Sequence, residues 1–317
     1  MKKLNYPFDA EEIFKKKRSI KRELMNGDRE YLIKKVAILG GMTTSGIKDM
    51  LELFLMNNGI RPFFYESEYN RYYEEGIFEN PQLEAFCPDI IYICTCNRNI
   101  HNFPELTDSR DVVNKKLEEN YNRFEAVWKS LGKRYNCPII QNNFEYPAYR
   151  LLGNRDAWDY RGKTNFITEL NRKIYNYAES NDNFYICDIN YISASYGLEK
   201  WSKPYYWYMY KYALEISAIP YLSFNVANII KSVFGRNKKA FNLDLDNTLW
   251  GGIVGDFAYR IIIPVYDATG KMVSYQGRFI GTDKDIPRYK NLSLEKSLVD
   301  PKSILFNENN VVGDTVY

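Results

Sequence analysis

The sequence contains one histidine, no cysteines in a Cys-x-x-Cys spacing and no long apolar run. The first two shortages argue against a structural zinc site, and five scattered cysteines are typical of reduced, buried thiols. No apolar stretch reaches the length of a transmembrane helix, and the N-terminus lacks the apolar core of a signal peptide. We therefore expect a cytoplasmic protein without a membrane partner.

The sequence also lacks a large excess of charge of either sign. Its 43 Lys and Arg and 40 Asp and Glu give a formal net charge of +3. Both signs are spread evenly along the chain, so nothing in the charge pattern indicates a nucleic-acid partner. Aromatic residues are abundant instead, with 28 Tyr and 18 Phe. The length of 317 residues suggests two domains.

Short apolar runs alternate with helical patterns along most of the chain. We expect strands at residues 35–41, 61–65, 89–96, 137–141 and 184–188. Helices are expected at residues 8–27, 114–131, 165–178, 201–212 and 219–234. This alternation predicts an α/β fold with a doubly wound, mostly parallel sheet. The helix at 201–212 is densely aromatic, so its rings either face a partner or, as we prefer, pack between two domains.

Polar residues follow the ends of these strands. The first strand leads into a glycine turn, after which Thr43, Thr44 and Ser45 can cap a helix that runs to about Asn58. Such a junction offers backbone N–H groups to an anion. Because the carboxyl ends of parallel strands meet at one edge of a sheet, we expect a shared site there. Its candidate binding residues are Gly41, Thr43, Thr44, Asn97, Asn142 and Asp188.

A later apolar strand runs into two aspartates, Asp244 and Asp246, with Thr248 shortly after and a Trp-Gly-Gly turn beyond. Two carboxylates at a strand end suit Mg²⁺, which prefers hard oxygen ligands. With the phosphate charge neutralised, Asp244 could attack phosphorus and Asp246 could protonate the leaving group. The alternative is an ordinary polar strand-to-turn junction. The strand before the two aspartates and the turn after them favour a catalytic role for this segment.

Residues 244–256, Asp-Leu-Asp-Asn-Thr-Leu-Trp-Gly-Gly-Ile-Val-Gly-Asp, resemble motif I of the haloacid-dehalogenase superfamily and in particular its FkbH-like branch, subfamily IIIC. The resemblance implies a Mg²⁺-dependent phosphatase or phosphoglyceryl transferase. Such enzymes act with a carrier protein and a phosphorylated three-carbon substrate in polyketide or surface-polysaccharide biosynthesis. It also implies that Asp244 and Asp246 hold Mg²⁺ and that Asp244, Asp246 and Thr248 belong to the catalytic site.

The preceding α/β region resembles the SGNH-hydrolase-like domain that is found ahead of the phosphatase module in FkbH-like proteins. The resemblance runs through residues 65–69, 151–155, 196–201 and 206–212, and together with the motif it covers about residues 15–256. It implies a sheet of the SGNH or flavodoxin type.

The chain departs from that pattern at the nucleophile, because Met42 stands where an SGNH esterase has its serine, and a thioether cannot attack a carbonyl. Ser45 is better explained as a helix cap, and His101 follows the third strand rather than lying near the C-terminal end. We therefore expect binding rather than ester hydrolysis.

After Asp256 the pattern changes to a β-hairpin at residues 260–278, which does not read as the later strands of a phosphatase core. Residues 257–317 resemble part of a phage-type DNA primase ahead of its Toprim domain. We expect an N-terminal helix at 1–30, the α/β domain at 31–234, the start of the phosphatase-like domain at 235–256 and the hairpin tail at 257–317. Because that core looks truncated, activity should be weak or absent. One alternative is a non-catalytic binding remnant or fusion. The least favoured alternative is a nucleic-acid function that depends on the tail.

Overall fold

The computed structural model describes residues 1–26, 30–236, 257, 260–266, 272–281, 285–293 and 297–298. The chain divides into two compact units, Met1–Asn237 and Lys238–Tyr317, and each is described by itself. The predicted Asp244, Asp246 and Thr248 lie outside the described residues.

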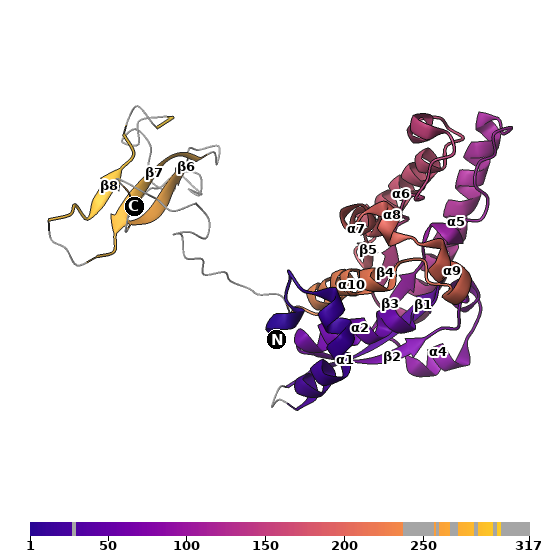
Figure 1. The fold of residues 1–317 in the computed structure, drawn as a ribbon, viewed down its shortest axis with the longest axis horizontal. Helices are drawn as coiled ribbons and strands as arrows, with labels where there is room; N and C mark the ends of the chain where they lie inside the picture. Colours follow the sequence, from indigo (N-terminus) through magenta and orange to yellow (C-terminus); the bar gives the residue numbers. More distant parts are fainter. Residues whose placement is uncertain are drawn as a thin grey trace. The chain divides into compact units, whose positions relative to one another are not determined.

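The first unit is built on a five-stranded parallel sheet with the order β2-β1-β3-β4-β5 (Figure 1). The strands are β1 (Leu32–Gly40), β2 (Ile60–Glu66), β3 (Ile90–Cys94), β4 (Ile139–Asn142) and β5 (Phe184–Cys187). The chain order reverses between β1 and β3, which makes this pair the topological switch point of the sheet. The predicted doubly wound α/β fold is therefore confirmed.

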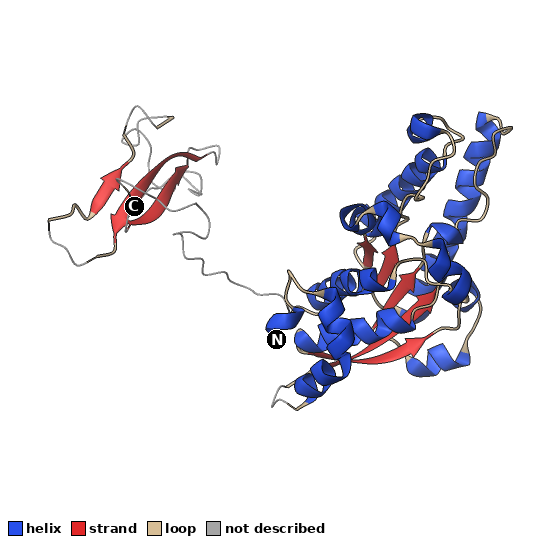
Figure 2. Ribbon diagram, viewed as in Figure 1, coloured by secondary structure: helices blue, strands red, loops and turns tan. Residues whose placement is uncertain are grey.

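Helices cover both faces of this sheet (Figure 2). They are α1 (Ala10–Met25), α2 (Ser45–Asn57), α3 (Tyr72–Ile77), α4 (Pro81–Phe86), α5 (Arg110–Tyr135), α6 (Lys163–Glu179), α7 (Ile189–Tyr196), α8 (Leu198–Trp201), α9 (Pro204–Tyr210) and α10 (Ile219–Val233). Short 3-10 turns lie at Lys2–Leu4, Asn97–Asn99, Gly153–Ala157 and Ile216–Ala218. None of the helices described here is both long and apolar enough to cross a bilayer.

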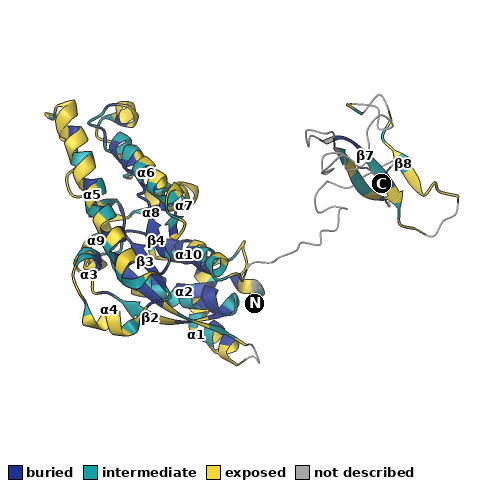
Figure 3. Cartoon of the chain, turned by 180° about the vertical axis from the view of Figure 1, so that it is seen from behind, coloured by how far each residue is buried: buried dark blue, intermediate teal, exposed yellow. Residues whose placement is uncertain are grey.

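Two apolar cores lie on opposite faces of the sheet, and the period of two along each strand divides its side chains between them. In β1, Val36 and Ile38 join the core under α1, α2 and α10, whereas Ala37 and Leu39 join the core under α5 and α6. Burial on both faces explains why β1 and β3 are continuous apolar runs in the sequence. The central strands β3 and β4 are accordingly buried along their whole length (Figure 3).

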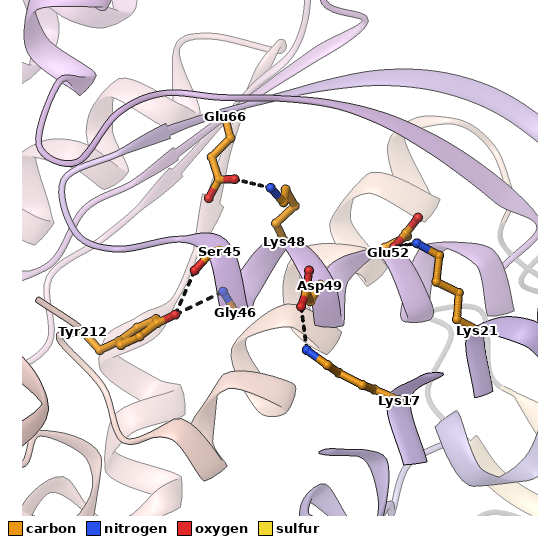
Figure 4. Close-up of polar contacts among 9 residues, drawn as sticks. All are labelled: Lys17, Lys21, Ser45, Gly46, Lys48, Asp49, Glu52, Glu66 and Tyr212. Atoms are coloured by element: carbon orange, nitrogen blue, oxygen red, sulfur yellow. Dashed lines mark hydrogen bonds and ion pairs between the residues drawn. The ribbon is translucent and has the colours of Figure 1, made fainter. Parts of the chain in front are cut away.

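The N-terminal helix α1 packs against α2 and adds two ion pairs on the surface (Figure 4). Lys17 Nζ lies 2.7 Å from Asp49 Oδ2, and Lys21 Nζ lies 2.6 Å from Glu52 Oε2. Such exposed pairs contribute little on their own. The buried Ile13, which lies in the same core as α2, holds the helix in place.

The aromatic segment expected as one helix at 201–212 is interrupted, because Pro204 starts the new helix α9 after α8 has ended at Trp201. Trp201 is buried, whereas no side chain of α9 is buried. The expectation that this helix packs between two domains stays a prediction.

The second unit contains a three-stranded antiparallel sheet of β6 (Arg260–Tyr266), β7 (Met272–Phe279) and β8 (Tyr289–Asn291). The predicted hairpin is therefore confirmed. Arg260 is buried there, and its Nη1 donates to the carbonyl oxygens of Gly277 at 3.3 Å and Pro287 at 2.7 Å. These bonds satisfy part of the buried guanidinium and tie the segment before β8 to the hairpin.

Candidate functional site

The loops that follow β1, β2 and β3 meet at the carboxyl edge of the sheet, and one buried side chain joins them. The Asn99 carboxamide accepts from the Cys96 N–H at 2.9 Å and donates to the Gly41 carbonyl at 3.0 Å and to Asn70 Oδ1 at 3.2 Å. Gly41 is required by this approach, since a Cβ there would lie 2.4 Å from Asn99 Oδ1. The sequence places Asn99 at a strand end but does not reveal that it links the loops.

The turn after β1 is fastened to the segment that follows α9. The Thr43 N–H donates to the Lys211 carbonyl at 3.1 Å, and Thr43 Oγ1 donates to the Tyr210 carbonyl at 2.7 Å. The Gly41 N–H is also engaged, by the Cys94 carbonyl at 3.0 Å. These N–H groups, which we expected to face an anion, therefore already have partners within the chain.

The N-terminus of α2 is capped by a tyrosine hydroxyl rather than by the expected threonine and serine side chains (Figure 4). Tyr212 Oη accepts from the Gly46 N–H at 3.3 Å and lies 3.0 Å from Ser45 Oγ. Thr44 occupies the N-cap position, but its hydroxyl donates to Glu66 Oε1 at 2.7 Å. Glu66 also pairs with Lys48. The hydroxyls at this turn thus have structural partners.

Met42 is 2 % exposed and belongs to the core under α2, so its side chain packs among apolar residues. Within the described residues, no hydrogen bond joins Ser45 to His101, whose backbone N–H instead donates to Asn120 Oδ1 at 2.9 Å. The described residues therefore contain no serine–histidine pair at this edge that could form an acyl intermediate.

The remaining predicted residues lie at the ends of β3, β4 and β5. Asn142 is fully buried, accepts from the Tyr92 hydroxyl at 3.0 Å and donates to the Thr95 carbonyl at 3.0 Å. Asp188 caps α7 and accepts from Asn143 Nδ2 at 2.6 Å. The structure places these groups at strand ends, as the sequence suggested. Both the oxygen and the nitrogen of the Asn142 amide are hydrogen-bonded within the protein. Their role in binding a ligand stays a prediction.

A buried carboxyl group that sequence reasoning missed lies beside Asn97. Glu145 is 1 % exposed, and its Oε2 accepts from the Asn97 N–H at 3.1 Å. Burial raises the pKa of Glu145 to about 8, although its hydrogen bonds and Arg98 oppose the shift. Glu145 is therefore mostly neutral at pH 7. A glutamate in a loop carries no local signal of such burial, which is why the sequence did not reveal it.

A cavity of about 750 Å³ opens at this edge between the loops after β3 and β4 and the helices α6, α8 and α9. Its cationic groups are Arg98 and Lys163, whereas Glu199 is acidic. The Arg98 guanidinium lies 4.6 Å from the centre of the Trp207 ring, so this arginine is held against an aromatic wall. Asn97 is the one predicted site residue that lines the cavity. The arrangement can bind an acidic ligand that also has an apolar part.

Within the described residues, no three His, Cys, Asp or Glu side chains gather closely enough to hold a metal ion. The predicted ligands Asp244 and Asp246 lie outside those residues.

A parallel sheet of this strand order, covered on both faces and with its polar loops at the carboxyl edge, defines a doubly wound α/β unit. Residues 35–231 match the family model described as FkbH, N-terminal domain. The match extends over more than half of the chain, and the chain belongs to this family. The predicted FkbH-like resemblance is thereby confirmed at the level of the family.

Several solved structures are similar to the chain. The N-terminal part of the protein BF1531 from Bacteroides fragilis, containing a phosphatase domain complexed with Mg, is 23% identical over 77% of this chain and has a TM-score of 0.65. The alignment covers 63% of that neighbour's chain, so this chain spans less than two thirds of its length. No curated protein matches the chain.

Two further structures match the chain at lower similarity. TesA is 10% identical, with 63% of this chain and 98% of TesA covered and a TM-score of 0.40. A GDSL-like lipase from Bacteroides thetaiotaomicron is 14% identical, with 69% of this chain and 99% of the lipase covered and a TM-score of 0.33. The primase resemblance of residues 257–317 is supported by none of these matches and stays a prediction.

Proposed function

We propose that the α/β unit of this FkbH-like protein binds an acidic ligand without hydrolysing it. The observation that carries the proposal is Met42, whose buried thioether occupies the position expected for an esterase nucleophile. The nearby cavity nevertheless keeps a cationic and aromatic lining through Arg98, Lys163 and Trp207. A site that has lost its nucleophile but has such a lining is suited to recognition.

The motif at Asp244, Asp246 and Thr248 contributes phosphoryl chemistry in this proposal. Asp244 and Asp246 would hold Mg²⁺, which when bound neutralises charge on the phosphate. Asp244 is the nucleophile and Asp246 moves the proton to the leaving group. Support comes from the motif itself and from the Bacteroides fragilis neighbour, which contains a phosphatase domain complexed with Mg. The proposed partners are a carrier protein and a phosphorylated three-carbon substrate, in the cytoplasm.

Turnover by this chain is proposed to be slow. The hairpin of β6 and β7 follows the motif in sequence and is antiparallel, whereas the phosphatase core expected from the motif would continue with parallel strands. A non-catalytic binding protein is therefore the second candidate function. It is favoured by the same hairpin and by the buried Met42.

The deciding experiment measures Mg²⁺-dependent phosphate release from p-nitrophenyl phosphate and from a phosphoglycerate donor, for the wild type and for Asp244→Asn. We expect slow release that Asp244→Asn abolishes, whereas no release above the level of Asp244→Asn would favour the binding protein. Release at ordinary enzymatic rates that the substitution abolishes would instead establish catalysis at Asp244 and overturn the proposal of slow turnover. Removing one such group commonly costs on the order of 100- to 1,000-fold in rate, so the two outcomes are easily separated.

A further inference from the structure

A second and smaller hollow, of about 210 Å³, lies next to the cavity described above and shares Arg98 with it. It is bounded by the loop after β2, which contributes Asn70, by the loop after β3, which contributes Arg98 and His101, and by Arg123 from α5. Asn99 lines the hollow and donates to the Gly41 carbonyl after β1, so the hollow lies beside the topological switch point between β1 and β3. Ligands of open α/β sheets bind at that position.

Three basic side chains, Arg98, His101 and Arg123, line the hollow, and one carboxylate, Glu74, lies among them. Neither arginine is among those that form salt bridges in the described part of the chain. The Arg123 guanidinium lies 3.5 Å from the centre of the Tyr73 ring, and its Nε is buried without a hydrogen-bond partner. The guanidinium also lies beside the Tyr72 hydroxyl, but its Nε keeps a donor for another group.

The polar wall opposite these cations is fixed before any ligand arrives. Asn99 Nδ2 bonds both the Gly41 carbonyl and Asn70 Oδ1, which joins the loops after β1, β2 and β3. Asn70 has a φ of 62°, in the left-handed region that asparagine tolerates better than most residues. Because the wall is held by these contacts, little ordering is needed on binding.

The electrostatics of His101 agree with a site that lacks a negative charge. Burial and the nearby charge of Arg123 lower the pKa of His101, in that order of size. An anion between these two groups would remove the repulsion and favour the protonated imidazole.

We propose that this hollow binds the phosphoryl group of a small phosphorylated molecule, or free phosphate, between Arg98, His101 and Arg123. Two guanidinium groups outweigh the one lining carboxylate, and their planar N–H pairs match the geometry of a phosphate. The volume admits a phosphoryl group with a short organic part. This site does not depend on phosphoryl transfer at Asp244, so it stands even if that chemistry fails.

The test titrates the full chain with inorganic phosphate and, separately, with 3-phosphoglycerate, and follows heat or NMR shifts without any turnover. Arg123→Gln should weaken binding of the tighter probe on the order of 10- to 100-fold, as expected for loss of a charged hydrogen bond. The matched control is Arg110→Gln, because Arg110 also stacks on a tyrosine, Tyr160 at 4.9 Å, but lies outside the hollow. Its affinity should be unchanged.

Arg123 also packs on Tyr73, so a second variant separates binding from folding. His101→Asn leaves that stacking intact and should weaken the same probe severalfold with an unchanged melting temperature. The proposal is overturned if neither probe binds, if Arg123→Gln and His101→Asn bind as tightly as the wild type, or if Arg110→Gln loses as much affinity as Arg123→Gln. Tighter binding of 3-phosphoglycerate assigns the site to a phosphorylated metabolite, and equal binding assigns it to the phosphate group alone.

Discussion

The interior of the parallel sheet and its carboxyl edge both contain fully buried side chains, but different forces hold those side chains in place. In the interior, the paired Ala37 and Ile91 are fully buried among apolar neighbours. At the edge, Gln141 is just as buried, yet it accepts from Trp128 Nε1 at 2.9 Å and donates to Thr95 Oγ1 at 2.7 Å. Burial stabilises the first region through apolar area, whereas the second depends on every polar group finding a partner.

This difference explains how the edge keeps its shape with a methionine at position 42. Asn99 and Asn142 fix the loops through hydrogen bonds that do not involve Met42 or Ser45. The bonds that position the loops are thus separate from the atoms that would do chemistry. Ester hydrolysis can be absent while the cavity persists.

The largest expected effect comes from breaking the interior. Trp128→Ala removes a buried ring that packs between Tyr177 and Phe184 and also leaves Gln141 Oε1 without its donor. We expect a loss of about 3–5 kcal/mol in the free energy of unfolding. The control Trp158→Ala removes an exposed ring and should change stability by less than about 0.5 kcal/mol. Chemical denaturation measures both, and similar losses would contradict the contrast.

The next effect depends on pH and belongs to the edge. The folded-state pKa of Glu145 is about 8, against 4.5 as the reference value, so between these values the native state holds a proton that the unfolded state releases. Stability should therefore be highest below pH 4.5 as far as this group is concerned and should fall as pH rises to 8. The slope is at most about 1.4 kcal/mol per pH unit.

Glu145→Gln keeps an acceptor for the Asn97 N–H and removes the titration, so the variant should lose this part of the pH dependence. Denaturation curves of both proteins at several pH values provide the measurement. Identical pH profiles would show that Glu145 is not protonated in the folded chain.

A smaller effect is expected where the loops approach each other. Gly41→Ala would place a Cβ 2.4 Å from Asn99 Oδ1 and should destabilise the unit by about 1–3 kcal/mol. Gly132→Ala is the matched control, because this glycine lies in α5 with no atom near its added Cβ. It should stabilise the unit by up to about 1 kcal/mol. If Gly41→Ala and Gly132→Ala shift the melting temperature in the same direction, the close contact between Gly41 and Asn99 would be refuted.

The smallest expected effect concerns chemistry at the edge. Because Met42 is buried and Ser45 Oγ lies beside Tyr212, p-nitrophenyl acetate turnover should equal that of an unrelated protein and should not change in Ser45→Ala. Turnover clearly above this background that the substitution abolishes would identify Ser45 as a nucleophile and would make the edge catalytic.

Sequence patterns predicted the interior better than the edge. The apolar runs of β1 and β3 gave their strands to within a few residues, because a strand buried on both faces needs such a run. The break at Pro204 was not predicted, since the aromatic pattern on either side of it resembles one continuous helix.

The edge residues were predicted only in part. Asn97 was found because it directly follows a strand, and it lines the larger cavity. Arg123 and Glu145 were missed, because α5 and a loop bring them to the edge from distant parts of the chain. Their burial follows from tertiary contacts that have no local period. The motif at Asp244 shows the opposite case, a clear sequence signal outside the described residues.

The position of α10 has a consequence for how the chain is made. This helix is the last of the α/β unit, yet it packs on α2, and Ser223 Oγ donates to the Ile47 carbonyl at 3.2 Å. A ribosome adding about 5–20 residues per second needs on the order of ten to thirty seconds to reach α10 after completing α2. During that time the apolar side of α2 lacks its cover. The nascent unit therefore completes its fold only once translation has passed Val233, and until then α2 presents the surface that a chaperone would meet.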